Sequence, residues 1–335
     1  MPPAGARPAT DRIEKLAADV PLLPAAAAEL GTPARTRRWH IAVFLAPALL
    51  VYTVLMIVPL ADTLRLSLFR SVEHAPVFVG LDNFRVLFGD SRWSLHFWAA
   101  LGHNFYFFAF HLLLQNPVGI ALAALLSLPR LRGQAFYRTA FFLPTMLSFV
   151  VVGFTWKLIL SPLWGVAPTL LGAVGLHGWF HPWLGQEATA LTTLALISVW
   201  QYVGIPTMLI YAAMLAIPHE LIEAAELDGI TGFAQFRTIK LPLIWPTIGI
   251  CSILTFVGNF NAFDLIYTVS GANAGPNFAT DILGTFLFRT FFGNQLQLGD
   301  PNMGAAIATM MFLIILAGVS AYLFGIQARM RRYAL

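Results

Sequence analysis

Several residue combinations in this 335-residue chain are close to known catalytic patterns, and each lacks a necessary member. HELIE at 219–223 begins like the zinc pattern HExxH, but the second ligand position holds Glu223. His177 and His181 are four residues apart, yet glycine and proline surround them, which favours a surface turn over a metal site. No Gly-x-Ser-x-Gly sequence occurs, and no lysine follows a glycine as in a phosphate-binding loop. We therefore expect no catalytic residue, no metal site and no bound cofactor.

The strongest chemical signal is instead a cluster of acids. Four of the sixteen acidic residues lie within nine positions: Glu220, Glu223, Glu226 and Asp228. Carboxylates at this density cannot enter hydrocarbon, so the segment must face water. An interfacial amphipathic loop without a partner and a docking site for a basic partner both fit these residues.

The elements around this cluster are strongly apolar. Hydrophobic residues make up 58% of the chain and charged residues only 11%, and the mean hydropathy is +0.73. This composition is typical of a membrane protein with several spans. Six apolar stretches are long enough to cross about 30 Å of hydrocarbon as helices. They lie at about 40–61, 101–128, 139–160, 190–215, 244–269 and 303–326.

The basic residues predict the orientation of these spans. With a cytoplasmic N-terminus, eleven basic residues face inward: Arg35, Arg37, Arg38, Arg130, Arg132, Arg138, Arg237, Lys240, Arg329, Arg331 and Arg332. Five face outward: Arg65, Arg70, Arg85, Arg92 and Arg289. The excess predicts that both termini are cytoplasmic. Residues 1–39 are rich in alanine and proline and are expected to form a disordered cytoplasmic tail. Nucleic acid is not an expected partner, because the net charge is only +4.

The acidic cluster is expected to form part of a pair of short helices, 218–228 and 231–241. Pro218 suits a first helical turn, and Glu220 complements the positive end of the helix dipole. Gly229 stands where a left-handed C-terminal cap usually lies. Pro242 is expected to end the second helix at Leu241.

The stretch EAAELDGITGFAQFRTIKLP resembles the EAA loop of ABC importer permeases. One departure is Ile230, where the family usually has a small residue. VGLDNFRVLF at 79–88, RGQAFYRTAFFLP at 132–144 and the stretch 266–292 are similar to segments of carbohydrate-type members, and the resemblance covers about 40–330. The ending RMRRYAL is similar to the subunit type that includes the larger maltose permease. The matching loop residues are Glu223, Ala224, Ala225, Asp228, Gly229, Phe236, Ile239, Leu241 and Pro242.

The resemblance implies an all-α membrane protein with six transmembrane helices and the MetI-like permease fold, formed by residues 40–335. It implies that the coupling loop (residues 218–241) docks onto an ATPase. The implied partners are a second homologous permease, two ATP-binding subunits, an extracytoplasmic solute-binding protein and membrane lipid, in a bacterial inner membrane. ATP and Mg²⁺ would be used by the ATP-binding subunits.

Polar residues inside the spans are candidates for a substrate path. Thr255, Asn259 and Ala262 share one helical face, although such groups also join helices at about 0.6–2 kcal/mol each. The resemblance to the larger maltose permease extends this set to the turn of the fourth span. The implied path residues are Trp200, Gln201, Tyr202, Ile205, Thr255, Gly258, Asn259 and Ala262. The sugar itself stays open: a disaccharide, an oligosaccharide, a polyol or glycerol phosphate.

The alternative is a self-sufficient secondary transporter for a small polar solute. Such proteins often carry acids within the membrane and inverted repeats. Asp264 is the only acid within an expected span, and no repeat is evident. Uptake driven by an ion gradient with this chain alone would favour this alternative.

Overall fold

The computed structural model describes residues 39–72, 75–128, 131–295 and 297–327. The predicted tail and seven of the inward-facing arginines lie outside the described residues: Arg35, Arg37, Arg38, Arg130, Arg329, Arg331 and Arg332. The chain divides into two units, Met1–Pro59 and Leu60–Leu335. The sites described below all lie in the second unit.

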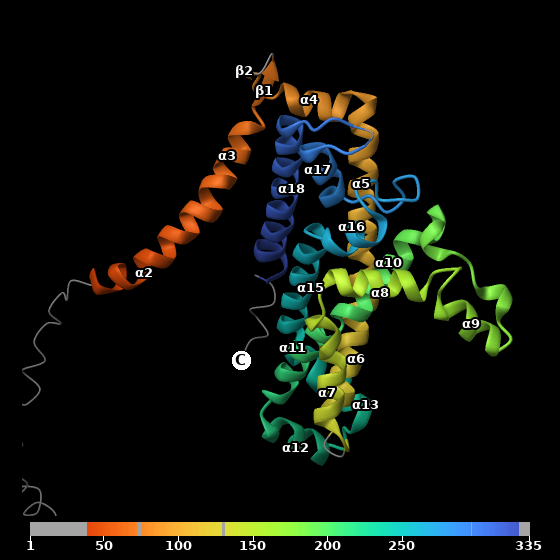
Figure 1. Cartoon of the computed structure of the whole chain (residues 1–335). Helices are drawn as coiled ribbons and strands as arrows, with labels where there is room; N and C mark the ends of the chain where they lie inside the picture. The colour runs from red at the N-terminus through yellow and green to blue at the C-terminus, as the bar shows by residue number, and fades with distance from the viewer. Residues whose placement is uncertain (1–38, 73–74, 129–130, 296, 328–335) are drawn as a thin grey trace, which may run out of the picture. The chain divides into compact units, whose positions relative to one another are not determined.

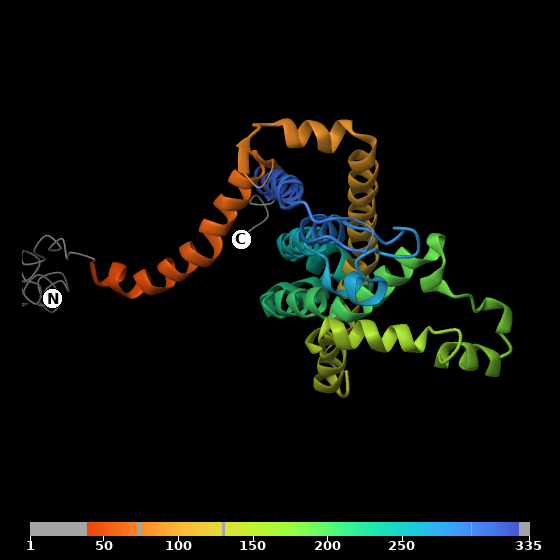
Figure 2. The ribbon, with the colours of Figure 1, turned by 45° about the horizontal axis from the view of Figure 1, so that its top comes forward.

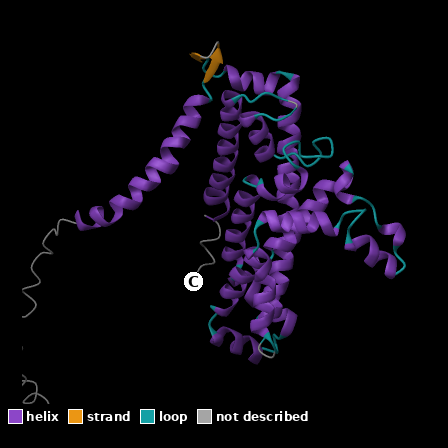
Figure 3. Cartoon of the chain, viewed as in Figure 1, coloured by secondary structure: helices purple, strands orange, loops and turns teal. Residues whose placement is uncertain are grey.

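Helices dominate the described part of the chain, and the strands are confined to one short hairpin (Figure 3). The first unit contains α2 (Trp39–Tyr52), the π-helical turn η1 (Thr53–Ile57) and the start of α3 (Val58–Leu66). Its side chains from Val43 to Pro59 are all exposed within the chain, and most are apolar. Such a helix needs lipid or an apolar partner around it.

The second unit contains the other five membrane-crossing elements. Two are nearly continuous: α5 (Ser91–Phe110), η2 (His111–Gln115) and α6 (Asn116–Leu126), then α18 (Pro301–Ala321) with η7 (Tyr322–Gln327). Three are bent pairs of helices. In the first, α7 (Gln134–Phe142) and η3 (Leu143–Met146) precede α8 (Phe149–Ile159). The second joins α10 (Glu187–Tyr202) to α11 (Gly204–Leu215). In the third, α13 (Gly232–Gln235), η6 (Phe236–Lys240) and α14 (Leu241–Leu243) precede α15 (Trp245–Phe260).

In the described part of the chain, three helices are long and apolar enough to cross a membrane alone, and counting each bent pair as one crossing gives up to six. The bends are 97° between η3 and α8, 41° between α10 and α11, and 67° between α14 and α15. Pro206 and Pro246 follow two of these breaks and leave the carbonyls four residues earlier without a helical donor. The predicted all-α fold with six membrane-crossing elements is confirmed.

Short elements close the two ends of the second unit. β1 (Phe69–Val72) pairs antiparallel with β2 (Ala75–Phe78), and α4 (Asp82–Gly89) runs across the end of α5 (Figures 1 and 2). α12 (His219–Leu227) lies at the opposite end of this unit (Figure 1). The remaining short helices are α9 (Val166–Ala173), η4 (His177–Trp179), η5 (Trp183–Gly185), α16 (Asp264–Ser270) and α17 (Leu283–Phe292).

Three apolar clusters hold the second unit together. One joins α8, α10 and α16, a second joins α4, α5, α17 and α18, and a third joins α6, α11 and α15. Close approach depends on Gly204, because a Cβ there would lie 2.5 Å from the Phe141 carbonyl oxygen. This glycine allows α11 to pass against α7 at the bend of the fourth crossing.

Two predicted spans have different ends in the structure. The second helix begins at Ser91, ten residues before the predicted 101–128, because polar residues in its first turns obscured its start. The fifth was predicted at 244–269, but α15 ends at Phe260 and α16 is a separate helix. The predicted span was extended because Leu265, Ile266 and Val269 are apolar, but in the structure these residues pack on α8.

Candidate functional site

The coupling loop forms two short helices, as predicted. Pro218 is the N-cap of α12, and Gly229 has φ +77°, the left-handed value that glycine tolerates best. The Gly229 amide donates to the Glu226 carbonyl at 3.0 Å, and the Ile230 amide donates to the Ala225 carbonyl at 2.8 Å. These two bonds form a Schellman motif, so the helix ends where the glycine predicts.

The second helix of the loop differs from the prediction. Pro242 was expected to end it at Leu241, but the helix continues to Leu243 and breaks at Ile244. The widened turn η6 (Phe236–Lys240) precedes the proline. Helical φ and ψ are compatible with proline when the missing donor is accommodated locally, and a π turn provides that adjustment.

The residues that match the EAA pattern divide between the interior and the surface. Ala225 is buried, and Phe236 and Leu241 pack against the cluster of α6, α11 and α15. Glu223 and Asp228 are exposed. The remaining members are exposed or half-buried: Ala224, Gly229, Ile239 and Pro242. One set of positions fixes the loop to the helices, and the other faces outward.

The outward face combines acids with large apolar side chains. Leu227 is 89% exposed and Phe233 is 76% exposed. All four acids of the cluster are exposed. Among the described residues, their only contact with a basic side chain joins Glu223 to His219 Nδ1 at 3.1 Å, an ion pair when the imidazole is protonated. Exposed apolar side chains with polar residues at their rim are a common feature of protein-binding surfaces.

A cavity of about 340 Å³ opens between the second, fourth and fifth crossings. Of the eight predicted path residues, six line it: Tyr202, Ile205, Thr255, Gly258, Asn259 and Ala262. Trp200 packs edge-to-face on Trp156 at 5.5 Å and lies outside the lining. Gln201 is fully buried outside the cavity, where its Nε2 donates to the Leu147 carbonyl at 3.1 Å. Adjacent helix positions differ by about 100°, which turns these two side chains away from Tyr202.

The polar groups of the fifth crossing are partly used within the protein. The Thr255 hydroxyl lies 2.8 Å from the Cys251 carbonyl and 3.2 Å from Asn116 Oδ1 on the second crossing. Asn259 Nδ2 donates to the Thr255 carbonyl at 2.7 Å, and its own carbonyl accepts from Asn104 at 2.9 Å. These residues therefore join helices as well as lining the cavity.

Sequence reasoning missed the wall of the cavity that the second crossing supplies. His111 and Gln115 lie there, opposite Ser198 of the fourth crossing, and Asp264 lies at the start of α16. The π turn η2 sets the directions of His111 and Gln115 and cannot be read from hydropathy. Pro117, two residues after the turn, was the available signal.

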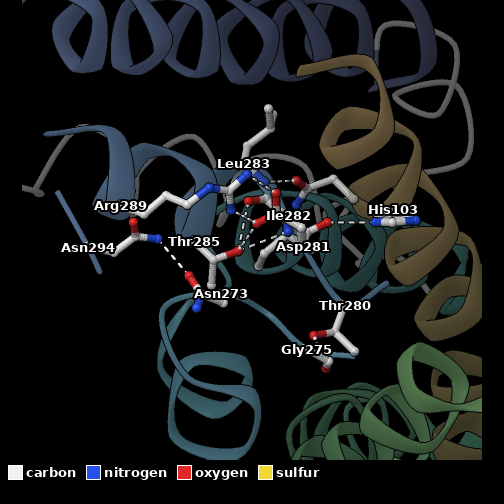
Figure 4. Close-up of polar contacts among 11 residues, drawn as sticks. His103, Asn273, Gly275, Thr280, Asp281, Ile282, Leu283, Thr285, Arg289 and Asn294 are labelled. Atoms are coloured by element: carbon white, nitrogen blue, oxygen red, sulfur yellow. Dashed lines mark hydrogen bonds and ion pairs between the residues drawn. The ribbon is translucent and has the colours of Figure 1, made fainter. Parts of the chain in front are cut away.

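The segment 271–300 between α16 and α18, named the outer segment here after its predicted side of the membrane, contains a buried ionic network (Figure 4). The Arg289 guanidinium donates to both carboxylate oxygens of Asp281 at 2.5 Å, and the Thr285 hydroxyl donates to the same carboxylate at 2.7 Å. His103 donates to the Asp281 carbonyl at 2.7 Å. Both charged side chains are at least 97% buried. Arg289 therefore serves the fold, although the orientation count treated it as an outward-facing charge.

The comparisons with known proteins agree with this architecture. The family model described as binding-protein-dependent transport system inner membrane component matches residues 115–332. The Bacillus subtilis protein named probable ABC transporter permease protein YurN is 34% identical over 277 residues, which cover 82% of this chain and 91% of that protein. The trehalose/maltose transport system permease protein MalF of Thermococcus litoralis is 31% identical, with 83% and 90% covered.

Two further comparisons extend this result. The lactose transport system permease protein LacF of Rhizobium radiobacter is 27% identical, with 86% of this chain and 94% of that protein covered. A chain of a bacterial ABC transporter that imports the acidic polysaccharide alginate has the same fold, with a TM-score of 0.72 at 23% identity. That alignment covers 88% of this chain and 96% of the other.

The chain belongs to the family of binding-protein-dependent transport system inner membrane components. It is a multi-pass permease, the transmembrane subunit of an ATP-driven importer. Nothing in the comparisons supports the alternative of a self-sufficient secondary transporter.

Proposed function

We propose that this chain forms one half of the translocation path of a sugar importer and receives the motion of a separate ATPase through the coupling loop. The observation that carries the proposal is the outward face of the coupling loop, where Leu227 of α12 and Phe233 of α13 are exposed and four carboxylates are exposed with them. A surface of this composition, at the end of the second unit opposite the β hairpin, suits a partner with an apolar pocket and basic residues.

The proposed assembly contains a second homologous permease, two ATP-binding subunits and an extracytoplasmic solute-binding protein. ATP and Mg²⁺ are used by the ATP-binding subunits, and this chain has no catalytic role. Both termini are proposed to lie in the cytoplasm, so that the coupling loop faces the ATPases. Closure of the ATPases around ATP would move α12 and tilt the crossings on which it rests, which opens the path to the other side.

A sugar is the proposed substrate. Relatives named for trehalose and maltose and for lactose cover more than four fifths of this chain. The cavity offers aromatic faces and hydrogen-bonding groups, the combination that sugars require. The proposed path consists of Tyr202, Ile205, Thr255, Gly258, Asn259 and Ala262, without Trp200 and Gln201, which lie outside the cavity.

Site-specific crosslinking tests the docking role. In a chain whose only cysteine is replaced by Cys251→Ala, Leu227→Cys is expected to crosslink to the ATP-binding subunit in the assembled complex. The matched control is Phe78→Cys on β2, also well exposed at 65% but at the other end of the second unit, which should not reach that subunit. Crosslinks from position 78 alone would reject the proposal.

Transport measurements test the energy source. Uptake of sugar into proteoliposomes that contain the whole complex should require ATP, and Glu223→Lys should lower uptake while the complex still assembles. Sugar uptake without ATP, or wild-type uptake by Glu223→Lys, would contradict this function.

A further inference from the structure

The second membrane crossing supplies a wall of the cavity to which no role has been given. Its helix widens into the π turn His111–Gln115, directly before Asn116 and Pro117. Such turns are rare in helices and are frequent at functional sites, because the extra residue redirects the neighbouring side chains. Here His111 and Gln115 both line the cavity.

The hydrogen bonds of His111 decide which groups of this wall act as donors and which as acceptors. Its Nδ1 lies 2.7 Å from the Phe107 carbonyl oxygen, which can only accept, so Nδ1 carries a proton. Nε2 lies 2.9 Å from Ser198 Oγ, and in the neutral ring it accepts the hydroxyl proton. The Ser198 hydroxyl has then used its donor and keeps oxygen lone pairs as acceptors for a bound molecule.

Gln115 adds a second acceptor to the wall. The side chain is 94% buried and lines the cavity, and its Oε1 has no hydrogen-bond partner among the described residues. A buried carbonyl oxygen without a partner costs about 1–3 kcal/mol, so native proteins rarely keep one without a purpose. Hydroxyl groups of a solute are suitable donors for both Gln115 and Ser198.

The charge of the lining selects among hydroxyl-bearing solutes. No lysine or arginine is among the described residues that line the cavity, and the one formal charge is the negative carboxylate of Asp264. A phosphate or carboxylate on the solute would lose its hydration here without gaining a cation. Rings of Phe107, Phe149, Tyr202 and Phe263 supply apolar faces for the C–H surface of a sugar.

The volume of the cavity limits the size of the solute that it can hold. About 340 Å³ is near the lower limit of small-molecule sites, which favours one or two sugar rings over a longer chain.

We propose that His111, Gln115 and Ser198 form a specificity wall that selects an uncharged, hydroxyl-rich solute of one or two sugar rings. This inference rests on the proposed function and deepens it. The wall excludes sugar phosphates and sugar acids from this chain's share of the path, in addition to any selection by the binding protein.

Protection of a thiol in the cavity tests the wall without the binding protein. In the assembled complex with Cys251→Ala, Ile205→Cys places a thiol on a lining residue that is 39% exposed. We expect trehalose, maltose and lactose at high concentration to slow its reaction with a small thiol reagent, and trehalose 6-phosphate to leave it unchanged. Equal protection by trehalose and its phosphate, or protection by none of the three disaccharides, overturns the proposal.

Two glutamines provide a matched comparison. Gln115→Leu is expected to raise the disaccharide concentration for half-protection about threefold to tenfold, the loss of one uncharged hydrogen bond. Gln201→Leu alters a glutamine that is fully buried and also has an unpartnered Oε1 among the described residues, but lies outside the cavity, and should leave that concentration unchanged. The same shift in both variants would assign Gln115 a merely structural role and overturn the proposal.

A second variant and a second readout separate folding from recognition. Ser198→Ala removes a hydroxyl with little change in volume and should also raise the half-protection concentration, and the yield of assembled complex shows whether the variant still folds. An unchanged half-protection concentration in both Ser198→Ala and Gln115→Leu would contradict the proposed role of the wall in binding the solute. Sugar uptake by the wild-type complex is measured in parallel: its absence defeats the proposed function, whereas ATP-dependent uptake without these shifts defeats only the wall.

Discussion

The coupling loop and the outer segment both contain acidic side chains, but these are exposed in the loop and one is buried and paired in the outer segment. In the outer segment, Asp281 and Arg289 are paired, and both are at least 97% buried. In the coupling loop, Glu220, Glu226 and Asp228 are exposed and make no ion pair with a described residue. The ion pair of the outer segment stabilises the fold of that segment, whereas the acids of the coupling loop remain at the surface.

The aromatic residues follow the same division. The Arg289 guanidinium carbon lies 4.8 Å from the centre of the Phe278 ring and 4.9 Å from the centre of the Phe286 ring. Phe233 of the coupling loop is 76% exposed. The network around Arg289 is therefore satisfied within this chain, whereas the coupling loop leaves its acids and a large aromatic side chain exposed. The comparison predicts that substitutions in the first region change stability and substitutions in the second change coupling.

The largest effect is expected from breaking the buried ion pair. Asp281→Ala leaves Arg289 without its counterion, and loss of one partner of a buried pair costs about 3–5 kcal/mol. We expect a correspondingly lower thermal midpoint or a loss of folded chain in detergent. The double variant Asp281→Ala, Arg289→Met removes both charges and should recover much of the loss. A double variant as unstable as the single one would show that the pair is not the source of stability.

A smaller effect is expected at the end of α12. Gly229→Val places a β-branched residue at φ +77°, which costs about 1–2 kcal/mol because left-handed backbone brings Cβ close to the next carbonyl. No atom lies within 4 Å of a Cβ built there, so the cost is conformational and not a clash. Gly229→Asn is the control, since asparagine tolerates this conformation. Equal thermal midpoints for the valine and asparagine variants would contradict the cap.

Both regions also show how far the sequence could predict the molecule. The number of crossings and the limits of α12 followed from apolar length, Pro218 and Gly229, which act locally. The end of the fifth crossing did not, because Leu265, Ile266 and Val269 of α16 extend the apolar stretch in the sequence but pack on α8 in the structure. Residue types predict local conformation such as helix ends. Whether an apolar face packs on lipid or on another helix depends on the tertiary fold.

The cavity shows the same limit. Tyr202 and Ile205 line it, and Trp200 and Gln201, in the same turn, do not. The family resemblance identifies the stretch of sequence that contains path residues, but the rotation of the helix decides which side chains in that stretch face the cavity. Likewise, the burial of Arg289 could not be read from its position in a predicted loop, since its partner Asp281 becomes a neighbour only through the turns of the outer segment.

The smallest change in stability is expected on the outward face of α12. Leu227 is 89% exposed, so Leu227→Ser should alter the free energy of unfolding by no more than about 0.5 kcal/mol, as surface substitutions usually do. The same variant should nevertheless weaken the stimulation of ATP hydrolysis by the loaded binding protein, because an interface loses an apolar contact. The control is Leu298→Ser in the outer segment, where the side chain is 92% exposed and coupling should stay normal. Normal coupling in Leu227→Ser would remove the main distinction between the two regions, since the exposed face of α12 would then be no more than a solvated surface.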